Sequence, residues 1–335
     1  MRRARVDIEA IADVRNLHAA FWRAALGKRH RRDVQEFESH LNSELASLRQ
    51  QILDGSISVG DMRSFRIFDP KPRMIHAPVF RERVLHHALM AQLGPVLDRA
   101  LVDDSFACRV GRGSLAAVRR AQEHSRRHPW FVKVDVRSYF ATINHDILIR
   151  LLDRRVGSAQ TLRLCERIIR AHKATPGCGL PIGALTSQYF ANHYLGGLDR
   201  HLLEHLQVEG MVRYMDDVVW WCRDRDDAKR TRDLVVAWVP ESLALELHAN
   251  VAIQRSTRGV SFLGFRVFPN RLLLSSRRRG RYRRARRRWE QAYRLGVIDG
   301  AQLQRAMDAV LAVTAHADAA GWRSRDLQRA PTVDA

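Results

Sequence analysis

The chain has 335 residues, enough for about two domains or one large multi-lobed fold, and its 46% hydrophobic content excludes whole-chain disorder. Lys and Arg number 57 against 36 Asp and Glu, a formal net charge of +21. This excess predicts a polyanionic partner, most simply nucleic acid, with an anionic membrane surface as the lesser option. The four cysteines form no CxxC pair, and no apolar stretch approaches the roughly 18 residues of a membrane span. We therefore expect a cytoplasmic protein without a zinc ribbon or disulfides.

The first 130 residues are predicted to be mainly helical. Apolar residues recur at helical spacing over 1–64, which indicates a helical N-terminal region. Two strand-like pieces then flank a charged turn at 69–73, and we expect a hairpin there. Further helices are predicted over 79–101 and from about 114 to 127.

The rest of the chain mixes strands and helices before a basic end. Residues 130–136 are apolar on both parities, as in a buried strand, and Asn144 is placed to cap the next helix. A Gly- and Pro-rich segment leads into a helix predicted over 185–206. Later segments are a hairpin of strands 212–215 and 218–221, a helix at 226–239, two or three strands in 243–273, and a very basic helical region beyond.

Two adjacent acids, Asp216 and Asp217, are predicted at the tip of the apolar hairpin. An isolated Asp-Asp pair is usually a solvated turn, but the flanks, which include Tyr214 and Met215, argue against a loose surface turn. Burial makes it costly to ionise both carboxyls, and a divalent cation would relieve the repulsion; oxygen ligands suit Mg²⁺. Asp135, at the end of the earlier strand, would complete a two-metal site able to activate a 3′-hydroxyl and stabilise a pyrophosphate leaving group.

The segment Tyr214-Met215-Asp216-Asp217 resembles the YxDD box of reverse transcriptases, and 131–140 resembles the first catalytic strand of that family. The order of motifs between about 65 and 270 is also similar. These are Lys71-Pro72-Arg73 in a hairpin, 109–114, Asp135, 179–188, the YMDD box and 262–265. The resemblance implies an α+β right-hand polymerase fold with fingers, an antiparallel palm and a helical thumb. It implies a helical N-terminal region at 1–64, fingers and a fingers–palm helix at 65–130, a palm at 131–270 with a fingers segment at about 144–182, and a basic thumb at 271–335.

Within that family, Ile182-Gly183 followed by Ser187-Gln188 resembles the signature of diversity-generating retroelement enzymes. This implies a bacterial or phage-encoded polymerase that copies a template-repeat RNA into cDNA with errors at template adenines. A small basic accessory variability protein is the implied partner, besides template RNA, cDNA and dNTP substrates. A group II intron-like or defence-associated reverse transcriptase is the nearest alternative, and an inactive RNA-binding scaffold is a remote one. We expect no RNase H domain after the palm.

The resemblance also assigns site residues. It implies two Mg²⁺ ions, for which Mn²⁺ can substitute, held by Asp135, Asp216, Asp217 and the Val136 carbonyl. It places nucleotide binding at Lys71, Arg73, Phe140, Ile182, Gly183 and Gln188. Template and primer contacts are expected at Arg109, Arg112, Tyr214, Met215, Arg281, Arg284 and Arg288.

Several of these residues have simpler interpretations. Phe140 fits an ordinary core position, the charges at 71–73 fit a solvated turn, and the glycines near 112 fit a simple turn. The basic run at 277–294 fits a solvated face, although interleaved aromatics favour a helix that packs on one side and meets phosphate on the other. Retroviral relatives carry Gln at the position of Ile182, and we hypothesise that losing this polar contact loosens base selection. The segment 245–252 has no Lys, which leaves His248 as the candidate proton donor to pyrophosphate.

Overall fold

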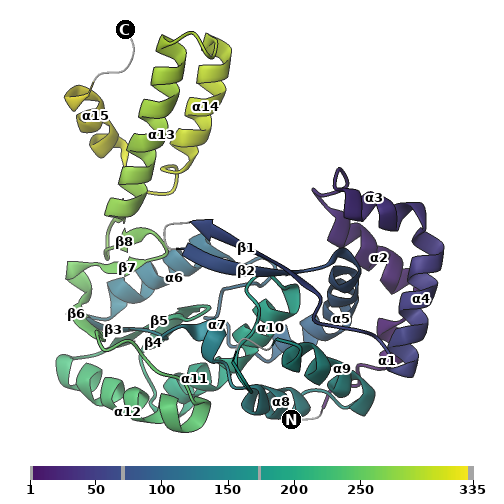
Figure 1. The fold of residues 1–335 in the computed structure, drawn as a ribbon. Coiled ribbons are helices and arrows are strands. Elements are labelled where there is room, and N and C mark those ends of the chain that lie inside the picture. Colours follow the sequence, from purple (N-terminus) through teal and green to yellow (C-terminus); the bar gives the residue numbers. More distant parts are fainter. Residues whose placement is uncertain (1–2, 69–71, 173–174, 331–335) are drawn as a thin grey trace.

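A computed structural model describes residues 3–68, 72–172 and 175–330 of the chain, and the molecule is of the α+β class (Figure 1). The predicted helical N-terminal region is confirmed. Asp13 begins the second helix by accepting a hydrogen bond from the Asn16 N–H. The helices of this region are α1 (Ile8–Ile11), α2 (Val14–Ala25), α3 (Arg32–Ser39) and α4 (Leu41–Asp54).

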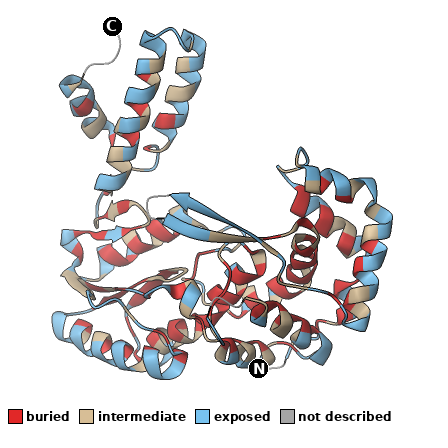
Figure 2. Cartoon of the chain, in the orientation of Figure 1, coloured by how far each residue is buried: buried red, intermediate tan, exposed pale blue. Residues whose placement is uncertain are grey.

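The predicted hairpin is confirmed, with both strands longer than expected. Strands β1 (Met62–Phe68) and β2 (Pro72–Pro78) pair antiparallel, with Phe65 opposite Ile75. Most of its described residues are exposed, so the hairpin projects from the body as a largely solvated ribbon (Figure 2). Helix α5 (Phe80–Arg99) follows directly, as predicted, and packs against α2.

A four-stranded antiparallel sheet forms the centre of the molecule. Its order is β4-β5-β3-β6, with β3 (Trp130–Asp135), β4 (Gly210–Tyr214), β5 (Asp217–Cys222) and β6 (Ala252–Arg255). Both faces are buried, because alternate side chains such as Trp220 and Trp221 enter two different hydrophobic clusters. Helix α12 (Arg225–Leu243) packs on one face and α6 (Ser114–Arg127) on the other.

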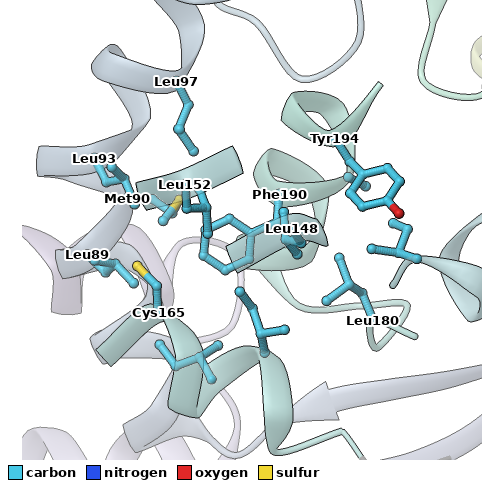
Figure 3. Packing of buried hydrophobic residues seen from close by; sticks show 14 of the residues in the cluster. Leu89, Met90, Leu93, Leu97, Leu148, Leu152, Cys165, Leu180, Phe190 and Tyr194 are labelled. Carbon is cyan, nitrogen blue, oxygen red and sulfur yellow. The ribbon is translucent and has the colours of Figure 1, made fainter. Parts of the chain in front are cut away.

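The helices beside the sheet share one apolar core with α5. Figure 3 shows leucines of α5 and α8 meeting Phe190 and Tyr194 of α10. The Asn144 side chain caps α8 as predicted, accepting the Ile147 N–H at 3.0 Å. The single helix predicted over 185–206 is divided near Gly196 and Gly197, which are weak helix formers. The elements are α7 (Tyr139–Thr142), α8 (His145–Asp153), α9 (Ala159–Arg170), α10 (Leu185–Tyr194), α11 (Gly196–Arg200) and a π-helical turn (His201–His205).

A small sheet links this body to a C-terminal helical unit. Its strands are β7 (Val260–Phe262), β8 (Phe265–Val267) and β9 (Leu272–Leu274), preceded by a short 3-10 turn (Ser256–Arg258). Helices α13 (Ser276–Arg294), α14 (Gly300–Ala312) and α15 (Ala320–Arg329) project from the body (Figure 1). In the described part of the chain, no helix has the length and apolar character needed to cross a membrane.

Candidate active site

The strand register brings the three predicted acids together. Asp135 ends β3 directly opposite Asp217, the first residue of β5, and Asp217 also pairs with Tyr214 at the end of β4. Met215 and Asp216 therefore form a two-residue turn between paired strands. Met215 has φ +58°, in the left-handed region that side chains other than glycine rarely adopt. The predicted hairpin with acids at its tip is confirmed.

The Asp216 carboxyl lies in an environment that opposes its charge. Burial, followed by the Asp135 and Asp217 carboxylates, raises the pKa of Asp216 to about 6. A backbone hydrogen bond and the Arg73 guanidinium act in the opposite direction. Arg73 belongs to β2, so the hairpin carries positive charge toward the acids. A buried carboxyl with two acidic neighbours favours a cation or cationic group beside it.

Lys133 compensates one of these acids, and sequence analysis missed it. Its ammonium donates to Asp217 Oδ2 at 3.0 Å, lies 2.8 Å from Oδ1, and donates to the Ser261 carbonyl at 2.7 Å. Burial still raises the pKa of Asp217, and Lys133 opposes that shift. Lys133 precedes Asp135 by two residues, so both side chains lie on one face of β3. That spacing was the available signal; the contact with Ser261, on β7, was not visible in the sequence.

The acids have the donor atoms and charge of a divalent-cation site, although their side chains are not arranged as a metal-binding cluster. Among the described residues, no group of three or more His, Cys, Asp or Glu side chains is arranged to hold a metal ion. Asp217 is engaged by Lys133, which leaves Asp135 and Asp216 as the available oxygen ligands. Burial raises the pKa of Asp216, and both acids carry the oxygen donors and negative charge that Mg²⁺ prefers, so they fit this ion in charge and donor type. Val136 forms an isolated bridge with Leu247, and metal binding by its carbonyl stays a prediction.

A buried ion pair supports the turn from beneath, and this also was missed. Arg213 and Asp199 have fully buried side chains, and the guanidinium donates to both Asp199 oxygens at 2.6 and 2.7 Å. Arg213 also donates to Asn192 Oδ1 at 2.7 Å and to the Met215 carbonyl at 3.1 Å. The left-handed residue of the turn is thus tied to α10 and α11 through one side chain.

A model of the family described as reverse transcriptase (RNA-dependent DNA polymerase) matches residues 68–267. The chain belongs to this family. The matched range contains the hairpin strand β2, the central sheet with its three acids, and most of the small sheet. The α+β fold is the one implied for a right-hand polymerase, so the predicted fold class is confirmed.

Curated relatives are similar at low identity. Protein YkfC of Escherichia coli is 26% identical over 182 residues, which is 50% of this chain and 47% of YkfC. Group II intron-encoded protein LtrA of Lactococcus lactis is 24% identical over 172 residues, which is 48% of this chain and 28% of LtrA. The chain thus spans less than half the length of these relatives. Among solved structures, telomerase from Candida albicans in complex with a telomeric RNA fragment has a TM-score of 0.48 and 11% identity over 81% of this chain and 54% of that one.

Some of the predicted nucleotide-binding residues lie where the loop before α10 meets the hairpin, whereas Arg73 lies near the tip of the hairpin, opposite Ile67. The His76 N–H donates to the Ile182 carbonyl at 2.8 Å, which joins β2 to the loop before α10. Gly183 and Gln188 line one small cavity of about 180 Å³. Phe140 is partly buried, with its ring 5.8 Å from that of Tyr139, and its role stays a prediction. Lys71 lies outside the described residues.

The motif at 109–114 differs from the expectation of template contact. The Arg109 side chain is 7% exposed and donates to Asp98 Oδ1 at 2.6 Å and to three backbone carbonyls. These bonds occupy its guanidinium, so the structure gives Arg109 the role of holding this loop to α5. Arg112 is paired with Asp103, at 2.7 Å between Nη2 and Oδ1. Both side chains would have to leave these partners to reach a template.

The other predicted contacts stay predictions, and their places in the structure are as follows. Tyr214 and Met215 are half-buried beside the acids, at the end of β4 and in the turn. The His248 N–H donates to the Asp135 carbonyl at 2.9 Å, which places the candidate proton donor next to β3. On α13, Tyr282, Arg286 and Glu290 are buried, and the three predicted primer–template arginines are exposed: Arg281, Arg284 and Arg288.

Proposed function

We propose that this chain is an RNA-directed DNA polymerase that extends a primer at the Asp135, Asp216 and Asp217 site. The observation that carries the proposal is the register of β3 and β5, which sets Asp135 opposite Asp217 beside an Asp216 of raised pKa. Membership of the reverse transcriptase family supports the same activity. We also retain the proposed boundaries of N-terminal region (1–64), fingers (65–130), palm (131–270) and thumb (271–335).

Each residue of the site has a separate proposed role. Asp135 and Asp216 would hold two Mg²⁺ ions, which when bound would activate the primer 3′-hydroxyl and stabilise the leaving pyrophosphate. Arg73 brings positive charge from the hairpin toward the acids, where an incoming triphosphate needs it. Lys133 keeps Asp217 paired and links the catalytic strand to β7. The Phe140 ring is the proposed barrier against a 2′-hydroxyl, favouring dNTP over rNTP.

The decisive experiment is Mg²⁺-dependent dNTP incorporation on a primed RNA. We expect incorporation by the wild-type chain and loss of at least a hundredfold for Asp216→Asn, because the variant removes a charge that cation binding requires. RNA binding by the variant should be unchanged. Binding without incorporation by the wild-type chain would instead favour the inactive RNA-binding scaffold.

We further propose that the enzyme is of the diversity-generating retroelement type. The support is Ile182-Gly183 followed by Ser187-Gln188, with Ile182 at the junction of loop and hairpin. The proposed template is a template-repeat RNA, and the proposed partner is a small basic accessory variability protein.

An apolar Ile182 cannot make the hydrogen bond that a Gln would make near the nascent base pair. We expect Ile182→Gln to lower misincorporation opposite template adenine several-fold while errors at other bases change less. Sequencing of primer-extension products measures this. An unchanged error rate at adenine would contradict the proposed role of Ile182.

A group II intron-like enzyme is the second candidate, favoured by the similarity to LtrA. The two types separate by error spectrum. Errors concentrated at template adenines support the retroelement type, and an even spectrum supports the group II-like one.

A further inference from the structure

A second basic site lies at the outer edge of the palm sheet. It is a pocket of about 440 Å³ between the N-terminal half of α12 and the edge strand β6. Lys and Arg make up 57 of 335 residues in the chain, yet they supply five of the nine residues that line this pocket, and no acid among the described residues lines it. The enrichment therefore exceeds what composition explains. The five are Arg225, Lys229, Arg232, Arg255 and Arg258.

Three of the five cations have no ion-pair partner within the described ranges of the chain. Lys229 pairs with Asp226 at 3.2 Å and Arg232 with Asp233 at 2.7 Å, so two charges are compensated by exposed acids outside the pocket. The other three cations are exposed. The Arg255 guanidinium lies 5.4 Å from the ring centroid of Trp130, which also lines the pocket. The Arg255 guanidinium is thus held by the face of an aromatic ring, and its N–H donors remain available to a ligand.

The pocket is remote from the catalytic acids. Trp130 begins β3 and pairs with Arg255, whereas Asp135 ends the strand, which at about 3.3 Å per residue separates the two ends by roughly 17 Å. Figure 1 shows α12 on the opposite side of the sheet from the thumb helices. A primer–template held between the acids and α13 would not fill this pocket.

We propose that this pocket, formed by α12 and β6, binds backbone phosphates of a part of the RNA that lies away from the duplex being copied. Arginine forks match phosphate oxygens, and three uncompensated forks converging on one concave surface favour a polyanion over a single charge. Five of the nine described lining residues carry positive charge and Gln254 is the one among them with a side-chain amide, so phosphate contacts, which carry no base identity, should dominate the binding. The proposal rests on the proposed function only in taking RNA as the ligand.

The test compares charge variants on two RNA probes. One probe is a short primer–template hybrid, and the other is the same hybrid joined to a long structured RNA. We expect the triple variant Arg225→Gln, Arg255→Gln, Arg258→Gln to bind the long probe at least tenfold more weakly, with the slope of log Kd against log salt reduced by about two to three. Its affinity for the short hybrid should not change.

Two further variants keep the result interpretable. The triple Arg15→Gln, Arg49→Gln, Arg154→Gln removes the same charge from exposed residues elsewhere and should change binding little. Lys at the three pocket positions should retain most of the long-probe affinity, because the charge remains. Equal losses in pocket and control triples, or no loss in either, would overturn the proposal. Binding of polyglutamate is measured as a third probe. If the pocket triple lost polyglutamate binding and kept RNA binding, the proposal would be overturned in favour of an acidic protein segment as the ligand.

Nucleotide incorporation on the short hybrid is measured for the same proteins. Absence of incorporation in the wild-type chain would remove the proposed polymerase function and leave the binding comparison valid. Incorporation by every variant, with long-probe affinity lost only in the pocket triple, supports both.

Discussion

The Asp216 carboxyl illustrates how a functional residue can oppose folding. Burial and its acidic neighbours raise its pKa from 3.8 to about 6. Between these values the folded chain holds a proton that the unfolded chain has released, so stability falls as pH rises through this window. We predict that Asp216→Asn is more stable than wild type by up to about 3 kcal/mol at neutral pH, and that the gain vanishes below about pH 3. Urea unfolding without metal measures the difference.

Magnesium and a surface variant serve as controls for this prediction. Glu241 is exposed, so Glu241→Gln should change stability little at either pH. Added Mg²⁺ should stabilise the wild-type chain more than Asp216→Asn, because only the former keeps the full set of carboxylates. A variant less stable than wild type at neutral pH would show that other charges in the folded chain compensate Asp216.

The Arg213–Asp199 pair should control the turn as well as the fold. Asp199→Asn leaves a buried guanidinium without its counter-charge, and we predict a loss of about 3–5 kcal/mol in unfolding free energy. Because Arg213 also holds the Met215 carbonyl, turnover should fall at temperatures where the variant is still folded. Denaturation and steady-state kinetics at low temperature measure the two effects.

Thr231→Val is the matched control, because it removes the partner of a buried Trp220 N–H at 3.0 Å without touching the turn. It should destabilise the protein by about 1–3 kcal/mol and leave turnover of the folded protein near that of wild type. Equal loss of turnover in both variants would assign the Arg213 network to stability alone.

At the scale of elements, local pattern predicted most of the architecture. The hairpin at 62–78, helix α6 and the YMDD turn each follow from spacing, glycines or alternation within a short segment. The long-range side-chain contacts of these elements do not follow from local pattern. Lys133 contacts residues 84 and 128 positions away, and Arg109 is held by an acid on α5. A sequence shows which side chains are charged, whereas the fold determines which of them are already paired with another residue of the protein.

The docking of the hairpin gives a prediction at the same scale. Gly183 has φ +122°, and a Cβ there would lie 2.8 Å from Ile75 Cγ2 and 3.2 Å from the His76 carbonyl on β2. Gly183→Ala should therefore push the hairpin away from the loop and displace Arg73, raising KM for dNTP by roughly tenfold, with a smaller change in RNA affinity.

Gly177→Ala provides the comparison, because Gly177 also has a positive φ, but a Cβ added there would meet no atom of the described residues within 4 Å. It shares the backbone strain and lacks the clash with β2. If both variants raised the KM for dNTP by the same factor, strain in the loop, and not hairpin docking, would control dNTP binding.

At the scale of the whole molecule, positive charge gathers on two surfaces to which we assign different tasks. Three arginines of the proposed thumb are exposed on α13, opposite the buried Arg286, and α13 follows directly after the small sheet; they are Arg281, Arg284 and Arg288. The basic pocket lies between α12 and the edge strand β6, at the end of β3 opposite to Asp135. A net charge of +21 alone would predict uniform, nonspecific attraction, whereas this separation predicts that the two surfaces bind different parts of one RNA.

The thumb variant tests this division. Replacing Arg281, Arg284 and Arg288 with Gln should weaken binding of short and long probes by the same factor, lower the salt slope by about two to three, and shorten products before dissociation. The pocket triple should weaken only the long probe and leave product length on the short hybrid unchanged. If both triple variants lost affinity for the short and long probes by the same factors, the charges would act as one diffuse electrostatic field. Only separate binding surfaces can discriminate between RNAs that share the same duplex.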